Sequence, residues 1–314
     1  MAGIIPYGST GRAAIMDAMQ DILQRFLFEH APIRGEIVHL DATWRAVLER
    51  HDYPPALRGI LGELMAACAL LAATLKFDGA VTLQIQGSGP VKLIVVECTA
   101  AHTMRATAKW SGELVSPELR ALLGDGRCAI TLVPGDGKQG YQGVVALEGR
   151  SVAQILEHYM MNSEQLETRL HLACDERHAA GLLLQKLPQR ARQSKDQTSD
   201  QGDDWERATQ LAATLAPREL LTLPAREILH RLYHEEDIRV FSPRTMSFLC
   251  TCSRERVAGM LRMLGRAEVE SILQERGAVD VSCEFCNSKY RFDSVDAAQV
   301  LAAELLTPPD TTRH

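Results

Sequence analysis

Four of the eight cysteines in this 314-residue chain form two closely spaced pairs near the C-terminus. The pairs have the spacings C-x-C and C-x-x-C, and their members are Cys250, Cys252, Cys283 and Cys286. Zn²⁺ prefers a tetrahedral shell of thiolates in structural sites, and two short cysteine pairs from separate turns can supply such a shell. The pattern therefore predicts that these four residues bind one zinc ion.

The residues around the cysteine pairs predict a small domain. The segments SFLCTCS from Ser247 and AVDVSCEFCNSKYRF from Ala278 have the composition of β-ribbon, and Asn287 suits a left-handed turn position. Ser253 is a candidate helix N-cap, while Gly265 and Gly277 are candidate helix ends. So short a segment has a small apolar core, and we expect zinc to supply folding free energy on the order of 10 kcal/mol.

Free thiols and a disulfide framework of a secreted protein are the other interpretations of the cysteine pairs. The first twenty residues lack a basic start followed by an apolar core, so they predict no secretory signal. The apolar run 64–75 is too short to cross a bilayer and predicts a buried helix. We therefore expect a cytoplasmic protein without membrane contact, in which cysteines at this spacing are metal ligands or redox switches.

The overall composition narrows the function classes. A hydrophobic content of 46% allows a substantial core in two or more units. The net charge of −6 gives no electrostatic reason to expect binding to nucleic acid or to an anionic membrane. We find no set of acid, base and nucleophile, so the sequence does not predict an enzyme.

Residues 21–188 alternate between helical and strand patterns. Two strand pairs joined by glycine-containing turns predict β-hairpins, one over 81–98 and the other over 128–147. We expect further strands at Met104 and Arg169, a capped helix from Ser151, and a helix or a strand pair over 21–40. Strands with short turns, mixed with helices, predict an α+β fold with a largely antiparallel sheet.

The composition changes after Pro188. Residues 189–204 are polar and of mixed charge, and they predict a mobile linker because they cannot bury enough surface to offset the entropy of ordering. Helical spacing resumes at Trp205 and again at Pro224. We thus expect five parts, which are an N-terminal extension (1–20), an α+β core domain (21–188), a flexible linker with amphipathic helices (189–237), a zinc-binding domain (238–293) and a C-terminal tail (294–314).

Six motifs, in this order along the chain, resemble the heat shock protein 33 family of redox-regulated holdase chaperones. They are LKFDG at Leu75, YQGVV at Tyr141, SEQL at Ser163, LLTLPA at Leu220, RLYHEED at Arg231 and CTCSRER at Cys250. The resemblance covers nearly the whole chain, from about Leu23 to Phe292. The first twenty residues and the long polar linker depart from it.

The resemblance implies that the four paired cysteines hold zinc in a reduced, inactive protein. It further implies that oxidation forms the disulfides Cys250–Cys252 and Cys283–Cys286, that zinc leaves, and that the C-terminal region unfolds. The active form is implied to dimerise and to bind unfolded or oxidatively damaged client proteins. We add the hypothesis that the segments 205–215 and 226–233 dock on the N-terminal sheet while zinc is bound and expose apolar surface when it is lost.

The cysteine pairs are also compatible with two other functions, nucleic-acid binding and thiol oxidoreduction. A zinc-ribbon nucleic-acid-binding protein is the main alternative, but the basic residues of 253–293 are balanced by acidic ones. A thiol oxidoreductase using Cys283 and Cys286 lacks the required strand-to-helix context. The remaining cysteines are expected to be small core residues, and they are Cys68, Cys98, Cys128 and Cys174. The histidines His230 and His234, one helical turn apart, are expected on a solvated helix face.

Overall fold

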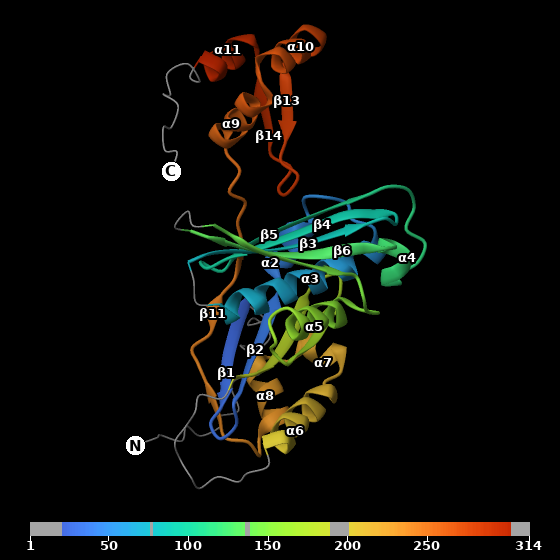
Figure 1. Ribbon diagram of the computed structural model, residues 1–314, viewed down its shortest axis with the longest axis vertical. Coiled ribbons are helices and arrows are strands. Elements are labelled where there is room, and N and C mark those ends of the chain that lie inside the picture. Colours follow the sequence, from blue (N-terminus) through green and yellow to red (C-terminus); the bar gives the residue numbers. More distant parts are fainter. Residues whose placement is uncertain (1–20, 76–77, 136–138, 189–200, 303–314) are drawn as a thin grey trace, which may run out of the picture. The chain divides into compact units, whose positions relative to one another are not determined.

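The computed structural model describes residues 21–75, 78–135, 139–188 and 201–302. These residues form two compact units that divide between Leu249 and Cys250. Each unit combines helices with antiparallel strand pairs, as Figure 1 shows, so the predicted α+β class is confirmed. The predicted extension 1–20, most of the predicted linker (189–200) and the end of the predicted tail (303–314) lie outside the described residues.

The first sheet of the larger unit, sheet A, has four central antiparallel strands. Strands β1 (Ile22–Phe28) and β2 (Ile33–Leu40) form the strand pair that was one of two alternatives for 21–40. Strand β2 pairs with β9 (Ala179–Lys186), which pairs with β8 (Thr168–Cys174), the strand expected at Arg169. Nearly every residue of β9 is buried. A strand covered on both faces has no polar alternation, which explains why the sequence pattern did not predict β9.

The second sheet, sheet B, contains both predicted hairpins. Strands β3 (Gly79–Gly87) and β4 (Val91–Thr99) form one, and β6 (Gly126–Pro134) and β7 (Tyr141–Ala146) form the other, so both predictions are confirmed. Strand β5 (Thr103–Trp110), expected at Met104, pairs with β4. The strand order β5-β4-β3-β6-β7 places the two hairpins side by side through β3 and β6.

One long helix, α3 (Pro55–Thr74), packs against strands of both sheets and fills the core of the larger unit. It is longer than the predicted run 64–75, because apolar residues continue toward its N-terminal proline. By length and composition this helix could cross a membrane, but 72% of its most apolar stretch is buried inside the protein. It is therefore the predicted buried helix.

Three shorter helices complete this core. They are α2 (Ala42–Leu48), α4 (Leu119–Leu123) and α5 (Val152–Asn162). The side chain of Ser151 accepts a hydrogen bond from the backbone N–H of Gln154, which confirms the predicted cap of α5.

Three helices that follow the polar stretch pack on the other face of sheet A. These are α6 (Gln201–Ala213), α7 (Pro217–Thr222) and α8 (Ala225–Tyr233). Trp205, Ile228 and Tyr233 form one buried cluster with Phe26 and Phe28 of β1. The rings of Phe28 and Tyr233 meet edge to face, with centroids 5.0 Å apart. The expected packing of 205–215 and 226–233 on the sheet is thus confirmed.

Residues 238–249 form a strap along the edges of both sheets. Strands β10 (Ile238–Val240) and β11 (Arg244–Thr245) pair with β1, and β12 (Ser247–Phe248) pairs in parallel with β5. The predicted start of the final domain at residue 238 therefore precedes the observed division after Leu249, because these strands complete the sheets of the larger unit.

The smaller unit has a small core of its own. Helices α9 (Arg254–Leu264) and α10 (Arg266–Arg276) precede the hairpin of β13 (Val279–Ser282) and β14 (Lys289–Phe292), and α11 (Ser294–Ala302) closes the unit. Ser253 caps α9, and Gly265 and Gly277 end the helices with positive φ, as predicted. The first predicted β-ribbon is wrong beyond Phe248, because Cys250 to Ser253 form no strand.

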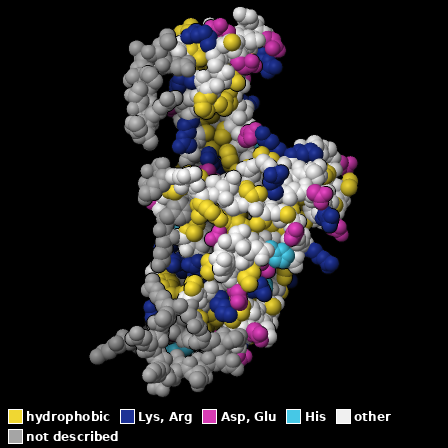
Figure 2. Space-filling model, in the orientation of Figure 1, with side chains coloured by type: hydrophobic (Ala, Val, Ile, Leu, Met, Phe, Trp, Pro, Cys, Tyr) yellow, Lys and Arg dark blue, Asp and Glu magenta, His cyan; other side chains and the backbone are white. Residues whose placement is uncertain are grey.

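The helix α11 lies where the sequence predicted a tail. Its residues Ala297 and Leu301 are buried in the same cluster as Phe292 of β14, so the part of the predicted tail up to residue 302 belongs to the folded unit. An ion pair also joins α9 to α11, in which the guanidinium of Arg254 lies 2.8 Å from the Asp296 carboxylate. On the face drawn in Figure 2, basic and acidic side chains are interspersed in both units.

The buried acid Glu36 gives the larger unit a predictable pH dependence. Glu36 lies on β2 opposite Arg25, is 1% exposed, and has no hydrogen-bond partner for either carboxylate oxygen. The nearest cation, the Arg25 guanidinium, is 3.6 Å away. Burial raises the pKa of Glu36 to about 7, although the charges of Arg34 and Arg25 oppose this shift. The folded protein thus holds this proton more tightly than the unfolded chain.

A folded-state pKa above the unfolded value means that stability is lost as pH rises from about 4.5 through about 7. We expect Glu36→Gln to remove this dependence and to raise the free energy of unfolding at pH 8 by up to about 3 kcal/mol. Denaturant titrations of both proteins from pH 5 to pH 8 measure the difference. The exposed acid Glu113, replaced by glutamine, is the matched control. Parallel pH curves for wild type and Glu36→Gln would contradict the prediction.

Candidate metal centre

The two cysteine pairs come from two different local structures of the smaller unit. Cys250 and Cys252 lie in the segment directly before α9. The N-cap of this helix is Ser253, whose side chain accepts a hydrogen bond from the backbone N–H of Arg256. Cys283 and Cys286 lie in the turn between β13 and β14. Because the hairpin and the helix pack on one core, the two pairs are brought to one place.

Backbone hydrogen bonds fix the turn that carries the second pair. The N–H of Cys283 donates to the carbonyl oxygen of Ser288 at 2.9 Å, and the N–H of Asn287 donates to that of Cys283 at 2.8 Å. Asn287 has a φ of 58°, which confirms the predicted left-handed position. The C-x-x-C spacing is thereby folded into a tight loop that directs both sulfur atoms to one side.

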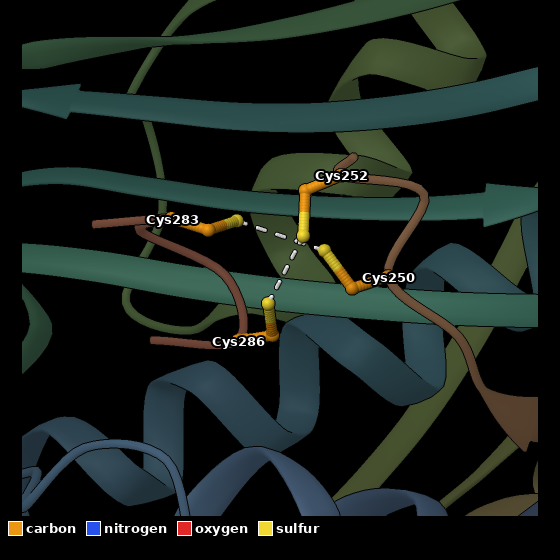
Figure 3. Close-up of side chains that lie close together, drawn as sticks. All are labelled: Cys250, Cys252, Cys283 and Cys286. Carbon is orange, nitrogen blue, oxygen red and sulfur yellow. Dashed lines mark hydrogen bonds between the residues drawn. The ribbon is translucent and has the colours of Figure 1, made fainter. Parts of the chain in front are cut away.

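The four sulfur atoms converge, as Figure 3 shows. All of them lie within 4.8 Å of one another. The sulfur of Cys250 is 3.7 Å from that of Cys283, and the sulfur of Cys252 is 3.3 Å from that of Cys286. Ligands at the usual Zn–S distance in a tetrahedron are about 3.8 Å apart, so the observed spacing fits a tetrahedral metal ion with four thiolate ligands.

Hydroxyl groups lie close to two of these sulfur atoms. The O–H of Tyr290 donates to the sulfur of Cys252 at 3.0 Å, and the Ser288 hydroxyl oxygen lies 3.1 Å from the sulfur of Cys286. The cysteine spacing predicts neither residue. Their only sequence signal is proximity to the second pair, and which of the neighbouring side chains faces the sulfur atoms depends on the turn and on the register of β13 and β14.

The local environment gives the thiols of Cys250, Cys283 and Cys286 different pKa values. Burial raises the pKa of Cys250 to about 12 and also raises that of Cys283. Burial acts in the same direction at Cys286, but hydrogen bonds with the side chain and backbone of Ser288 lower its pKa to about 6. A metal ion at this site must displace the remaining thiol protons, so its binding weakens as pH falls.

The other four cysteines lie elsewhere. Cys68, Cys98 and Cys128 are buried in the core around α3, as predicted, and Cys174 is partly buried beside it. Burial raises the pKa of Cys98 and of Cys128 to about 12. Thiols that stay protonated are poor nucleophiles, and these residues lie outside the group of four converging sulfur atoms, so a metal ion held there would not deprotonate them.

The histidine pair on α8 also follows its prediction. His230 and His234 are exposed on that helix, and their rings stack with centroids 5.8 Å apart. Within the part of the chain that the structure describes, the four paired cysteines are the single group of His, Cys, Asp or Glu side chains arranged to hold a metal ion.

Comparison with known proteins gives consistent matches over almost all of the chain. The family model described as Hsp33 protein matches residues 21–293. The 33 kDa chaperonin of Methylobacillus flagellatus is 50% identical over 94% of this chain and 99% of its own length. That of Chromobacterium violaceum is 51% identical over 94% of this chain and 98% of its own length.

A solved structure shows the same fold. The crystal structure of the 33 kDa chaperonin (heat shock protein 33 homolog) from Thermotoga maritima superimposes with a TM-score of 0.77. The match covers 91% of this chain and all of that chain, at 22% sequence identity. At this low identity the likeness concerns the fold alone.

Proposed function

Because this chain belongs to the Hsp33 family, whose curated relatives are named 33 kDa chaperonins, we propose that it is a holdase chaperone controlled by oxidation of its cysteine cluster. The chaperone activity follows from the family, and it consists of binding rather than of catalysis. The redox control is our proposal. The convergence of four cysteine sulfur atoms within 4.8 Å carries it.

Zinc is the metal that we assign to the reduced site. An all-sulfur donor set with tetrahedral spacing suits Zn²⁺, which has no redox chemistry of its own in proteins. When bound, zinc would hold the four thiolates deprotonated and tie the segment of Cys250 and Cys252 to the turn of Cys283 and Cys286. One ion per chain is expected.

Oxidation would use these thiolates as reductants. In each pair, one thiolate attacks hydrogen peroxide to give a sulfenic acid and hydroxide, and its partner displaces a second hydroxide to form the disulfide. We propose Cys250–Cys252 and Cys283–Cys286 as the products. The sulfur contacts of 3.7 and 3.3 Å join different pairs, and a disulfide bond of about 2 Å would draw two sulfur atoms closer together than a tetrahedral metal shell holds them. Their formation would therefore remove the shell that holds a metal.

Loss of the metal would leave the smaller unit with little to stabilise it. Its buried cluster consists of eight side chains: Val257, Ala258, Leu261, Val269, Val279, Phe292, Ala297 and Leu301. Domains with so small a core usually need a metal or another crosslink to fold. We propose that this unit unfolds on oxidation.

The same event would weaken the helices on sheet A. Cys250 is the second residue after β12, the last strand of the strap, and the strap continues from α8. The strands of the strap are only two or three residues long. Once the smaller unit that follows them unfolds, we expect these strands to separate from the sheets more readily. Release of α6, α7 and α8 would uncover Phe26, Phe28 and the other apolar residues of that face. Exposed apolar surface of this kind binds unfolded proteins.

We also propose the partners of the protein and its place in the cell. The clients are unfolded or oxidatively damaged proteins, and the oxidised form acts as a homodimer in the cytoplasm. A cytoplasmic location suits the switch, because a reducing environment regenerates the thiols once the oxidant is gone.

Measuring metal and activity in the same samples tests this function. We expect one zinc ion per reduced chain and no suppression of citrate synthase aggregation. After hydrogen peroxide at mildly raised temperature, we expect zinc release, two disulfides per chain and strong suppression. Elemental analysis, thiol counting and light scattering measure the three quantities.

The control is Cys174→Ser, which removes the most accessible cysteine outside the cluster. It should respond like wild type. Reduced protein without zinc, or activity that is equal before and after peroxide, would refute the proposed function.

A further inference from the structure

Tyr290 belongs at once to the sulfur cluster and to the apolar core of the smaller unit. It lies on β14 opposite Val281 of β13, and its ring packs against the buried cluster that contains Phe292. Its hydroxyl reaches the sulfur of Cys252 at 3.0 Å. A tyrosine ring held in this way has little freedom to turn its hydroxyl elsewhere.

The other three sulfur atoms accept hydrogen bonds from the backbone. The N–H of Cys252 reaches the sulfur of Cys250, the N–H groups of Phe285 and Cys286 reach that of Cys283, and the N–H of Ser288 reaches that of Cys286. These bonds follow from the chain path and do not depend on side-chain identity. The sulfur of Cys252 accepts a hydrogen bond from the side-chain hydroxyl of Tyr290.

We propose that Tyr290 is a positioning residue that sets both the metal affinity and the oxidant reactivity of Cys252. This inference rests on the proposed zinc-dependent function and assigns a regulatory residue within it. The hydroxyl gives the sulfur of Cys252 a hydrogen bond from a side chain, which, unlike the backbone hydrogen bonds to the other three ligands, a single substitution can remove.

A hydrogen bond donated to a thiolate has two consequences. It orients the ligand and favours its deprotonated form, and the loss of such outer partners typically weakens metal binding 10-fold to 100-fold. It also draws electron density from the sulfur, which makes attack on an oxidant slower. Without Tyr290, Cys252 would therefore be bound less well and would become the most nucleophilic of the four sulfur atoms.

The dual position of Tyr290 couples reactivity to folding. Because the ring is held by the small core, any loosening of the β13–β14 hairpin withdraws the hydroxyl from Cys252. The thiolate then attacks peroxide, forming an S–O bond as the O–O bond breaks and hydroxide leaves. The thiolate of Cys250 displaces hydroxide from that sulfenic acid, and the S–S bond forms. Partial unfolding by heat would thus accelerate oxidation.

Tyr290→Phe in the full-length chain isolates the hydroxyl, because phenylalanine keeps the ring in the core. We expect zinc affinity of the reduced protein, measured by chelator competition, to fall at least about 10-fold. Ser282→Ala is the matched control, since it removes an exposed hydroxyl from the neighbouring strand. Should the variant purify without zinc, titration of zinc into chelator-stripped reduced protein still gives its affinity.

A second readout follows the site of the first oxidation. Zinc-loaded protein is treated with less than one equivalent of hydrogen peroxide in the presence of dimedone, and the labelled cysteine is identified by mass spectrometry. We expect label at Cys252 to be the largest of the four in Tyr290→Phe and not in wild type or Ser282→Ala. A merely structural role of the ring would leave this pattern unchanged.

The outcomes separate the two proposals. Wild-type protein that binds no zinc would refute the proposed function itself. Wild-type protein that binds zinc, with affinity and labelling pattern unchanged in Tyr290→Phe, would overturn the role of Tyr290 alone.

Discussion

Replacement of all four cluster cysteines by serine is expected to unfold residues 250–302 and to yield a chaperone that is active without oxidant. Serine hydroxyls do not replace thiolates as zinc ligands. The metal is expected to contribute on the order of 10 kcal/mol to folding of a unit this small. The eight side chains of its buried cluster cannot make up that loss. The larger unit, with its two sheets and α3, should remain folded.

Hydrogen exchange resolved by peptide tests this expectation. Protection should disappear from 250–302 and decrease over 205–233, while it persists in sheet B. Aggregation assays should show suppression under fully reducing conditions. The control replaces His230 and His234 by alanine, which removes two exposed imidazoles. Zinc content, hydrogen-exchange protection and the inactivity of the reduced protein should all stay unchanged. A quadruple variant that stays folded and inactive would disprove the central claim.

The parts of the fold that the sequence predicted correctly have local signals. The strands of the β3–β4 hairpin alternate in burial, and both this hairpin and β6–β7 are joined by glycine-containing turns. The caps at Ser151 and Ser253 depend on a single side chain and the next turn of helix. Such features are fixed within a few residues, so their prediction did not require knowledge of tertiary packing.

The features that the sequence did not predict depend on distant partners. Strand β9 is buried on both faces, by α3 on one and by α6 to α8 on the other, and so shows no alternation. The strap β10 to β12 consists of strands of two or three residues, which exist because β1 and β5 offer free edges. The boundary expected at residue 238 was placed by composition, which carries no information about those edges.

The candidate metal centre also has one part that the sequence predicted and one part that depends on tertiary packing. Cysteine spacing predicted the four side chains that converge, since thiolate pairs at these separations are typical of metal sites. The hydroxyl of Tyr290 contacts Cys252 across a sequence separation of 38 residues. Its role depends on the register of β13 and β14 and on the packing of the ring, neither of which spacing encodes.

Ile228→Ala is expected to give chaperone activity in the reduced protein while its metal centre is intact. Ile228 is fully buried between α8 and sheet A, in the cluster that contains Phe26 and Tyr233. Truncation of a buried isoleucine to alanine costs about 3 kcal/mol. If that cost falls on docking of α6 to α8, the released population rises roughly 100-fold. The apolar face of sheet A would then be accessible without oxidation.

Three measurements on the reduced, zinc-loaded variant decide this prediction. Zinc content should remain at one per chain, hydrogen exchange should accelerate over 205–233, and aggregation of citrate synthase should be suppressed. Arg226→Ala, an exposed substitution on the same helix, should change none of them. If Ile228→Ala loosens the helices and the protein stays inactive, the covered face of sheet A is not the client-binding surface. Activity would then have to arise from the unfolded smaller unit, because oxidation changes that unit directly and the helices only through the strap.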